Sequence, residues 1–432
     1  MFSLDGSMQL PEETQVLIVG AGPIGLEMGV ALSRAGLDFC IVDAEQVGHT
    51  ISWYAPGTHF FSSPERIAIA GIPLLTSDQG KATREEYLNY LMSVAWQFDL
   101  PIHGGLRLQS IQRRADSEAR GGWKVSLQNK WHRPREASAG RVAGQSNPVS
   151  TIECRYLVLA TGDMHQPRRL DVAGEDQPNV SHYLQELRNY FRQEVVIVGG
   201  RNSAVEAAIR IFRMGGKVTM LCRGDSLDAT SIKYWLYPEI TSLIKNGMIR
   251  LIANSVVVRI DGDRVYYQAS HSQGENQNQD PAANEEPMGF VEADQILLLT
   301  GYIPDNSLYE RLGVDLEGDA FRPVHNESME TNLDNVFIAG TATAGSQYKH
   351  TVFIENSHEH VERILDAILD RESASGRNAA GANREMDSES GAQRSGEGSF
   401  LHGGPQGGRA GSARDGEDGK SLKALYSDHP ES

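Results

Sequence analysis

Two glycine-rich turns, far apart in the chain, hold the residues whose types and spacing most clearly indicate chemistry. The first turn fits the pattern GxGxxG with Gly20, Gly22 and Gly25. Gly20 permits a tight turn, Gly22 lets the backbone approach a pyrophosphate, and Gly25 lets the following helix pack closely on the strand. The helix that follows points its positive N-terminus at the phosphates. The first turn is therefore predicted to bind a dinucleotide; the alternative is a glycine-rich turn without a ligand.

An acidic residue follows the first turn at an informative distance. Asp43 ends the second predicted strand, where an acid hydrogen-bonds the ribose hydroxyls of a bound dinucleotide. Because a carboxylate repels a 2′-phosphate, this site is predicted to prefer FAD or NAD over NADP.

The second turn follows the same pattern more loosely. Its candidate residues are Gly199, Gly200, Arg201, Asn202, Ser203 and Ala204. Arg201 takes the place of the central glycine, and the next strand ends in Cys222 and Arg223 instead of an acid. A cation at that place suits a 2′-phosphate, so NADPH is favoured over NADH. The alternative is that Arg223 is only a solvated strand end. Cys222 beside it is interpreted as a buried core residue rather than a reactive thiol.

The elements around the two turns must position these residues. Each turn joins an apolar strand to a helix rich in alanine and isoleucine, at residues 16–22 and again at 195–201. Two such βαβ units this far apart predict an α/β protein with two Rossmann-like dinucleotide-binding domains rather than one doubled sheet. Two further apolar strands run into Thr-Gly, at 156–163 and 295–305, and a last one at 335–345 precedes a predicted helix.

The overall composition excludes several classes of protein. The chain has 432 residues, enough for two or three domains, and a formal net charge of −17. That charge argues against a general nucleic-acid binder, because phosphate contacts need clustered Lys and Arg. The three cysteines, Cys40, Cys154 and Cys222, form no CxxC pair and fit a reducing compartment. The sequence shows neither a signal peptide nor a membrane-spanning apolar run, so a cytoplasmic protein is predicted.

Three stretches are predicted to lie outside the packed core. Residues 129–150 and 270–287 are polar and indicate insertions. From about Glu372 to the end, glycine, serine, arginine and aspartate dominate. Such a segment buries too little apolar surface to offset its ordering entropy, so the tail is predicted to be disordered.

The arrangement of these motifs resembles the two-dinucleotide flavoprotein superfamily of thioredoxin reductases. The features that carry the likeness are the N-terminal GxGxxG, the central second turn, the two Thr-Gly strand ends and the late TNLDNVFIAG. Within that superfamily the chain is similar to the bacillithiol-disulfide reductase branch. The stretches that carry this second likeness are THFFSSPERIAIAGIPL, VVIVGGRNSAVEAA, LCRGD, SIKYWLYPE and TVFIENSHEH.

The resemblance implies a domain order and a set of cofactor contacts. An NADPH-binding domain at 166–292 would be inserted into a discontinuous FAD-binding domain at 1–165 and 293–371, followed by the disordered tail at 372–432. The implied NADPH-binding residues are those of the second turn together with Arg223. The implied FAD-binding residues are Gly20, Gly22, Pro23, Gly25, Asp43, Thr58, His59, Phe60, Phe61, Ser62, Ser63, Thr161, Gly162, Gly340 and Thr351.

The resemblance also implies electrostatic support for the flavin. A helix that begins at Thr351 would aim its positive end at the pyrimidine ring and stabilise the anionic reduced flavin. Three histidines are predicted beside the flavin, where they would pass a proton or, alternatively, make a structural hydrogen bond: His49, His59 and His350. His358 and His360 lie two positions apart in a predicted helix, so they do not share a face and no metal pair is predicted.

Three departures from the family pattern stand out. Thioredoxin reductases carry a CxxC in the NADPH domain, and this chain has none. Thr341 stands where many relatives have an aspartate that contacts the flavin side chain. Ile24 stands inside the first turn, where the bacillithiol branch commonly has a cysteine. Because isoleucine cannot attack a disulfide, a covalent route through that position is closed.

These observations predict an NADPH-dependent FAD oxidoreductase. The hydride would pass from NADPH to the flavin, and electrons would then pass to a small molecule or a small redox protein, for example a low-molecular-weight disulfide. The alternatives are a ferredoxin or flavodoxin NADP reductase, a flavin monooxygenase, and a flavin-binding redox sensor with little turnover. No metal, membrane or nucleic-acid partner is predicted, and a homo-oligomer is expected from the resemblance alone.

Overall fold

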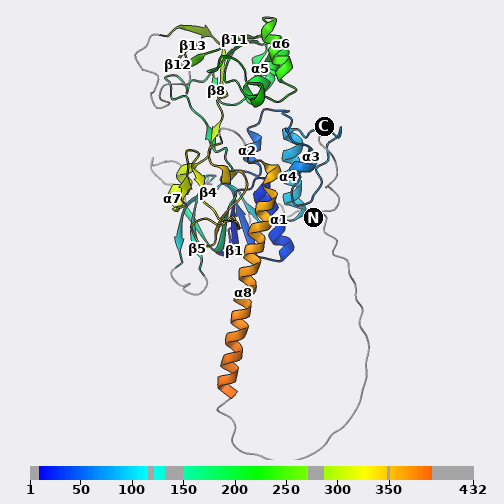
Figure 1. Cartoon of the computed structure of the whole chain (residues 1–432), viewed down its shortest axis with the longest axis vertical. Helices are drawn as coiled ribbons and strands as arrows, with labels where there is room; N and C mark the ends of the chain where they lie inside the picture. Colours follow the sequence, from blue (N-terminus) through cyan, green and yellow to red (C-terminus); the bar gives the residue numbers. More distant parts are fainter. Residues whose placement is uncertain (1–8, 115–120, 132–148, 271–286, 348–350, 392–432) are drawn as a thin grey trace, which may run out of the picture. The chain divides into compact units, whose positions relative to one another are not determined.

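The computed structural model describes residues 9–114, 121–131, 149–270, 287–347 and 351–391 (Figure 1). Of the described residues, those up to 373 form one compact unit and those from 374 onward belong to a second. The predicted insertions fall largely outside the described residues, as does His350. Within the described residues, every helix is too short or too polar to cross a membrane.

The first sheet has seven strands in the order β3-β2-β1-β6-β5-β4, with β19 also pairing with β6. Strands β1, β2, β3, β6 and β19 pair in parallel, whereas β4 and β5 are antiparallel. The strands are β1 (Glu13–Val19), β2 (Phe39–Val42), β3 (Ile102–His103), β4 (Leu106–Arg113), β5 (Trp123–Asn129), β6 (Val149–Leu159) and β19 (Val336–Ile338).

This sheet is buried on both faces, which explains why its central strands are apolar without alternation. Val16 and Ile18 of β1 belong to one hydrophobic cluster, and Leu17 and Val19 belong to another. The covering helices include α1 (Pro23–Ala35) and α4 (Arg84–Gln97) on the first face, and α7 (Asn306–Leu312) on the second. Shorter helices are α2 (His49–Ser52) and α3 (Pro64–Ile67).

The second sheet has five parallel strands in the order β11-β10-β9-β15-β8. The strands are β8 (Val180–Ser181), β9 (Glu194–Val198), β10 (Lys217–Leu221), β11 (Arg250–Ile252) and β15 (Gln295–Leu298). The helices α5 (Asn202–Arg213) and α6 (Tyr237–Lys245) cover one face. A three-stranded antiparallel sheet of β12 (Ser255–Asp261), β13 (Arg264–Ala269) and β14 (Gly289–Glu292) covers the other.

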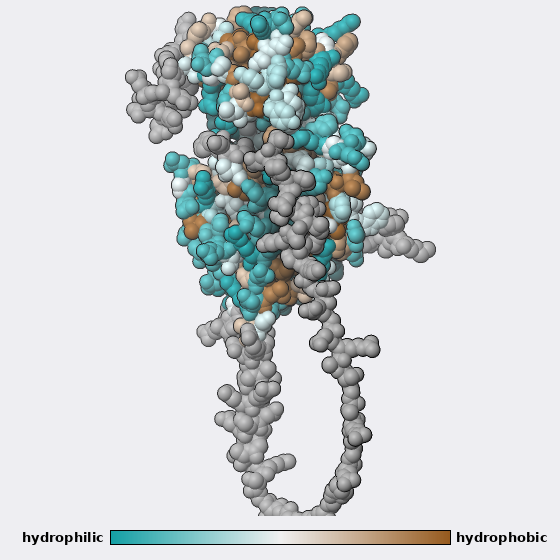
Figure 2. All heavy atoms as spheres, turned by 45° about the vertical axis from the view of Figure 1, so that its right-hand side comes forward, coloured by the Kyte–Doolittle hydropathy of each residue, from teal (hydrophilic) through white to brown (hydrophobic). Residues whose placement is uncertain are grey.

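Smaller elements connect these layers. Two two-stranded sheets pair β7 (Gln166–Pro167) with β16 (Tyr302–Ile303), and β17 (Leu316–Glu317) with β18 (Arg322–Pro323). The 3-10 helices are η1 (Leu187–Tyr190), η2 (Ala229–Ser231), η3 (Gly340–Ala344) and η4 (Ile354–Asn356). Hydrophilic residues cover most of the face in Figure 2, because the two sheets bury most of the apolar side chains.

The predicted fold class is confirmed, with two differences at the boundaries. In the chain, the second sheet lies between β6 and β19 of the first sheet. It includes β15, although the boundary predicted between residues 292 and 293 assigns β15 to the FAD-binding domain. The pairing of Ile296 with Val196 requires this assignment. The last helix, α8 (His358–Gly391), also runs past the predicted start of the disordered tail at 372. Alanine, arginine and glutamate in that segment favour a helix.

Candidate functional site

The first glycine turn is held by close contacts at two of its three glycines. Gly20 has a left-handed φ of 116°, and a Cβ there would lie 2.3 Å from the carbonyl oxygen of Ala160. A Cβ at Gly25 would lie 1.9 Å from the carbonyl oxygen of Gly20. Around Gly22, by contrast, no atom lies within 4 Å of the place where a Cβ would stand. The first and last glycines therefore close the turn, and the middle one leaves it open to a ligand.

Helix α1 begins at this opening without a side-chain cap. Its N-cap is Gly22, which has no side chain to accept a hydrogen bond from the first amides of the helix. Helix α4 shows the contrast, because Thr83 and Glu86 form a reciprocal capping box at its start. Uncapped amides at a helix start form a site for an anion such as phosphate.

Asp43 is fixed at the end of β2 by two backbone amides. One carboxylate oxygen accepts from the nitrogen of Ala21 at 2.6 Å, and the other accepts from the nitrogen of Glu45 at 2.7 Å. Burial raises the pKa of Asp43, an effect that the Ala21 hydrogen bond and the nearby His49 oppose. Burial lowers the pKa of His49, whose ring meets Trp53 edge to face at 5.2 Å. The Asp43 carboxylate thus lies directly at the first glycine turn, the place required of a side chain that hydrogen-bonds the ribose of a bound dinucleotide.

Ile24 is a packing residue between the first turn and η3. Its side chain is only 6% exposed, and it belongs to the hydrophobic cluster on the α1 face of the sheet. A Cβ at Gly340 would lie 3.3 Å from Cβ and Cγ1 of Ile24. Gly340 therefore lets the start of η3 approach the isoleucine, a contact between segments far apart in the sequence.

The second glycine turn repeats the backbone of the first. Gly199 has a φ of 142°, and a Cβ there would lie 2.5 Å from the carbonyl oxygen of Leu299. Ala204 is fully buried at the packing position, and α5 begins at Asn202 after the N-cap residue Arg201, which makes no side-chain cap hydrogen bond. In both turns the opposing carbonyl belongs to the residue just before Thr-Gly, namely Ala160 before Thr161 and Leu299 before Thr300.

The side chains around the second turn are cationic and exposed. Arg201 and Arg223 are both exposed, at the turn and just after β10. Asn202 accepts a hydrogen bond from the backbone nitrogen of Lys233 at 2.6 Å, which anchors the segment before α6 to the start of α5. Cys222 is buried, in agreement with its interpretation as a core residue.

All three cysteines of the chain are free, buried thiols. Burial raises the pKa of both Cys40 and Cys154 to about 12. Burial also raises the pKa of Cys222. Because a thiolate is the attacking species in disulfide exchange, none of the three is suited to that reaction near neutral pH.

The segment from Thr58 to Ser63 contacts residues that accompany the second sheet. The Thr58 hydroxyl donates to Glu206 of α5 at 3.0 Å, and the Lys233 ammonium donates to the His59 carbonyl oxygen and to Glu206, each at 3.2 Å. Phe61 stacks on Trp235 with centroids 5.7 Å apart. Sequence reasoning missed the contacts of Glu206, Lys233 and Trp235, although the last two stand in the motif SIKYWLYPE.

The segment from Gly340 to α8 differs from its predicted form. The predicted helix from Thr351 begins only at His358, because the Asn356 side chain accepts from the Phe353 nitrogen at 2.7 Å and closes a separate turn at η4. Thr351 is exposed, and its nitrogen donates to Gln347. Farther back, the Thr161 hydroxyl shares a hydrogen bond of 2.8 Å with the Tyr309 hydroxyl, next to Gly162.

The two histidines at the start of α8 have different partners. Both ring nitrogens of His358 face acceptors, the Glu27 carboxylate at 2.7 Å and the Arg66 carbonyl oxygen at 3.2 Å, and the bond to Glu27 raises the pKa of His358. Nδ1 of His360 instead accepts from the Gly340 nitrogen at 3.1 Å, and burial lowers the pKa of His360 to about 4. Among the described residues, no cluster of three or more His, Cys, Asp and Glu side chains is arranged to hold a metal.

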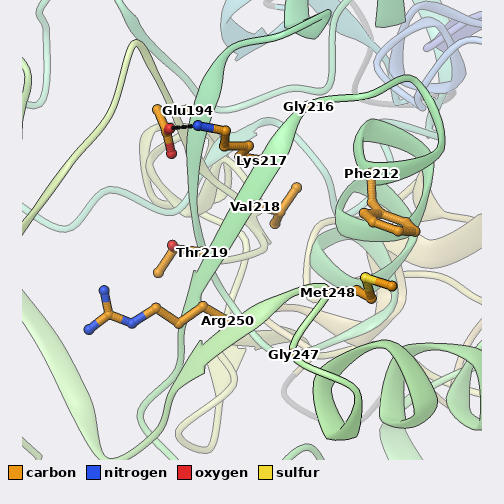
Figure 3. Close-up of a pocket in the computed structure, with 9 residues that line it drawn as sticks. All are labelled: Glu194, Phe212, Gly216, Lys217, Val218, Thr219, Gly247, Met248 and Arg250. Atoms are coloured by element: carbon orange, nitrogen blue, oxygen red, sulfur yellow. Dashed lines mark hydrogen bonds and ion pairs between the residues drawn. The ribbon is translucent and has the colours of Figure 1, made fainter.

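Figure 3 shows a surface pocket whose lining residues include none of the residues of either glycine turn. It has a volume of about 310 Å³ and lies at the first residues of β9, β10 and β11, where Lys217 pairs with Glu194 at 2.6 Å. The second glycine turn follows the opposite end of β9, beyond Val198. The parallel neighbour β10 ends on that same side, at Leu221. Ligands of parallel α/β sheets bind at the carboxyl ends of the strands, so this pocket is not the candidate dinucleotide site.

Comparisons with known proteins agree with this geometry. The family model described as pyridine nucleotide-disulphide oxidoreductase matches residues 17–120 and 145–340. Bacilliredoxin reductase Bdr of Bacillus subtilis is 29% identical over 367 residues, covering 83% of this chain and 99% of that protein. A ferredoxin–NADP reductase of Ignicoccus hospitalis is 25% identical over 76% of this chain and 89% of that protein. The structure of bacillithiol disulfide reductase Bdr from Bacillus cereus superimposes with a TM-score of 0.70 at 28% identity, covering 83% of this chain and 99% of that one.

Proposed function

Because the chain belongs to the pyridine nucleotide-disulphide oxidoreductase family, we propose that it is an NADPH-dependent FAD oxidoreductase that reduces a small acceptor. The chain is an enzyme of the thioredoxin reductase-like kind, and the family implies a flavin and a nicotinamide dinucleotide. When bound, the nicotinamide would supply a hydride to the flavin, and the flavin would supply the electrons for the acceptor. The protein contributes position and electrostatics.

The observation that carries the choice of cofactors is the contrast between Asp43 and Arg223. Both residues stand at or just after the end of the second strand of a βαβ unit, one after each glycine turn. The carboxylate of Asp43 accepts two backbone amides and suits a ribose with free hydroxyls, as in FAD. The exposed guanidinium of Arg223 suits a ribose 2′-phosphate, as in NADPH. We therefore assign FAD to the first sheet and NADPH to the second.

The residues of the first turn fit the pyrophosphate of FAD. The space at Gly22 and the uncapped start of α1 leave room and donors for phosphate oxygens. Gly340 stands close by, against Ile24, at the place assigned to the flavin side chain. The segment from Thr58 to Phe61, which contacts α5 and Trp235, is where we expect the flavin and nicotinamide to meet.

The acceptor is proposed to be a low-molecular-weight disulfide or a small redox protein. The relatives named bacilliredoxin reductase and bacillithiol disulfide reductase favour the disulfide. The three buried thiols and the isoleucine at position 24 indicate that the acceptor takes electrons without a mixed disulfide to this chain. The second candidate, a ferredoxin–NADP reductase, is favoured by the same lack of a usable thiol and by the Ignicoccus hospitalis relative. A cytoplasmic homo-oligomer remains part of the proposal.

Anaerobic reduction of the purified protein tests this proposal. NADPH is expected to bleach the flavin absorbance rapidly, with NADH slower. Bacillithiol disulfide, cystine, a quinone and ferredoxin would then be added in turn to the reduced protein, and the return of the absorbance followed. A protein without bound flavin would contradict the proposal, and slow reduction by both nucleotides would favour the redox sensor instead. Reoxidation by ferredoxin alone would favour the second candidate.

A further inference from the structure

Trp131 covers a pair of adjacent glycines at the start of β4. A Cβ at Gly104 would lie 2.6 Å from Cη2 of the indole, and one at Gly105 would lie 2.4 Å from Cδ2. Five carbons of the indole lie within 3.0 Å of one or the other of these Cβ positions, namely Cγ, Cδ2, Cε3, Cζ3 and Cη2, so the ring lies across both residues. Any side chain at either position would collide with the ring, and the glycine pair therefore forms a cradle for a flat aromatic group.

The cradle adjoins the segment that follows Asp43. The Leu106 nitrogen donates to the Asp43 carbonyl oxygen at 2.8 Å, and the Gly105 nitrogen donates to the Glu45 carbonyl oxygen at 3.3 Å. Lys130, the neighbour of Trp131, donates from its backbone to Gly105 at 2.7 Å and pairs through its ammonium with the Glu45 carboxylate. These bonds hold Trp131 beside the segment from Asp43 to Glu45, and the Asp43 carboxylate is proposed to hold the adenosine ribose.

Trp131 is 43% exposed although its ring lies against the glycines, so part of the residue remains accessible. The glycine pair is bonded to the segment from Asp43 to Glu45, so under the proposed assignment a base on a ribose held by Asp43 would lie within reach of that pair. Adenine is a flat aromatic group that gains affinity by stacking on another one.

We propose that Trp131 is the stacking surface for the adenine of the dinucleotide at the first turn. This inference rests on the proposed assignment of FAD to that turn. The proposal explains why positions 104 and 105 are both glycine, because only residues without a side chain let the indole lie close to Glu45 and the end of β2. Trp131 touches only the adenosine half, so it is a binding residue and not a catalytic one.

Titration of the apoprotein with two flavins tests the inference. FMN carries the ring system, the ribityl chain and one phosphate but has no adenosine, so it does not reach Trp131. Trp131→Ala is expected to weaken FAD binding about tenfold, from the usual gain of a stacked base, and to leave FMN binding unchanged. Quenching of flavin fluorescence measures both affinities. Trp131→Phe keeps an aromatic face and should recover most of the FAD affinity.

Trp96→Ala is the matched control, because Trp96 is 66% exposed on α4. It should change neither affinity. Equal FAD affinity in wild type and Trp131→Ala would overturn the inference while leaving the proposed function intact. Equal losses for FAD and FMN, in a variant that the phenylalanine substitution does not rescue, would also overturn it, since they indicate a general structural role. A wild-type protein that binds no flavin would instead overturn the proposed function and, with it, this inference.

Discussion

In the first glycine turn Gly22 leaves open space, whereas in the second the same place in the pattern is filled by the exposed Arg201. The backbones are otherwise alike. Gly20 and Gly199 have φ values of 116° and 142°, and each lies against a carbonyl oxygen that a Cβ would approach to within 2.5 Å. Backbone contact thus dictates the first glycine of both turns. No such contact restricts the middle position, and the two turns carry different residues there, Gly22 and Arg201.

The second difference lies one strand further along the chain. Asp43 accepts two backbone amides beside the first turn, whereas Arg223 is exposed beyond the second. A shared architecture therefore presents opposite charges at equivalent places. Because phosphate recognition depends on charge and on backbone access, the proposed assignment needs only two residues per turn to give one fold two cofactor preferences.

The largest expected effect distinguishes a glycine that the backbone conformation requires, Gly20, from one that leaves room for a ligand, Gly22. Gly20→Ala places a methyl group 2.3 Å from the Ala160 carbonyl oxygen at a left-handed φ, and we expect a loss of about 3 kcal/mol in the free energy of unfolding. Gly199→Ala should act in the same direction. Gly22→Ala meets no atom within 4 Å and should retain its stability while losing flavin. Chemical denaturation of the apoproteins measures the difference, and equal stability of the Gly20 and Gly22 variants would contradict it.

The next effect tests whether charge sets the second cofactor. Arg223→Glu puts a carboxylate at the second turn, and the ratio of kcat/KM for NADPH over NADH should fall roughly 100-fold, since like charges in contact cost several kcal/mol. Arg188→Glu makes the same charge change at an exposed position of η1 and serves as the control. Stopped-flow reduction of the flavin by each nucleotide gives the ratio. An unchanged ratio would leave Arg223 a solvated strand end.

A smaller effect is expected at the first strand end. Asp43→Asn keeps the size of the side chain but turns an NH₂ group toward one of two backbone amides, at Ala21 or Glu45. One donor then faces another donor, and FAD affinity should fall about tenfold. Asp38→Asn is the control, because Asp38 also accepts a backbone amide, from Gln15, before the start of β2. Flavin titration measures the FAD affinity of both variants. An equal loss in Asp43→Asn and Asp38→Asn would contradict the prediction.

The smallest effect is a pH dependence beside the first turn. The raised pKa of His358 means that its stabilisation is complete below the ordinary value of 6.5 and is lost as pH rises through the raised pKa. The lowered pKa of His360 means that its stabilisation is complete above 6.5 and is lost as pH falls toward about 4. His358→Gln should therefore cost more at pH 5.5 than at pH 8, and His360→Gln the reverse, each by about 1 kcal/mol or less.

Thermal unfolding of the three proteins at both pH values checks this prediction. Wild type, His358→Gln and His360→Gln share one helix, so each variant controls for the other. The groups that face His358 are Glu27, Glu362 and the Arg66 carbonyl, and those that face His360 are Glu359, His325 and Arg363. Parallel shifts in the two variants would contradict the opposite pKa directions.

Local patterns were the most reliable part of the sequence. The glycine turns, the strands before them and the fold class depend on spacing within a few residues, and all appear in the structure. The boundary at 292 and the helix start at Thr351 were wrong, because β15 pairs with a strand far away in the chain and Asn356 closes a turn before α8. Spacing alone carries no information about such pairing.

Ile24 shows the same limit. Its chemistry follows from its side chain, since an isoleucine offers no nucleophile at any position. Its packing against Gly340 and its 6% exposure depend on the return of β19 to the first sheet. The sequence by itself therefore determined the two turns and the charges beside them, because a turn is a local backbone arrangement. Only the tertiary structure decided what lies against them, Ala160, Leu299, Gly340 and the indole of Trp131 near Glu45, because those contacts join segments that the order of residues leaves far apart.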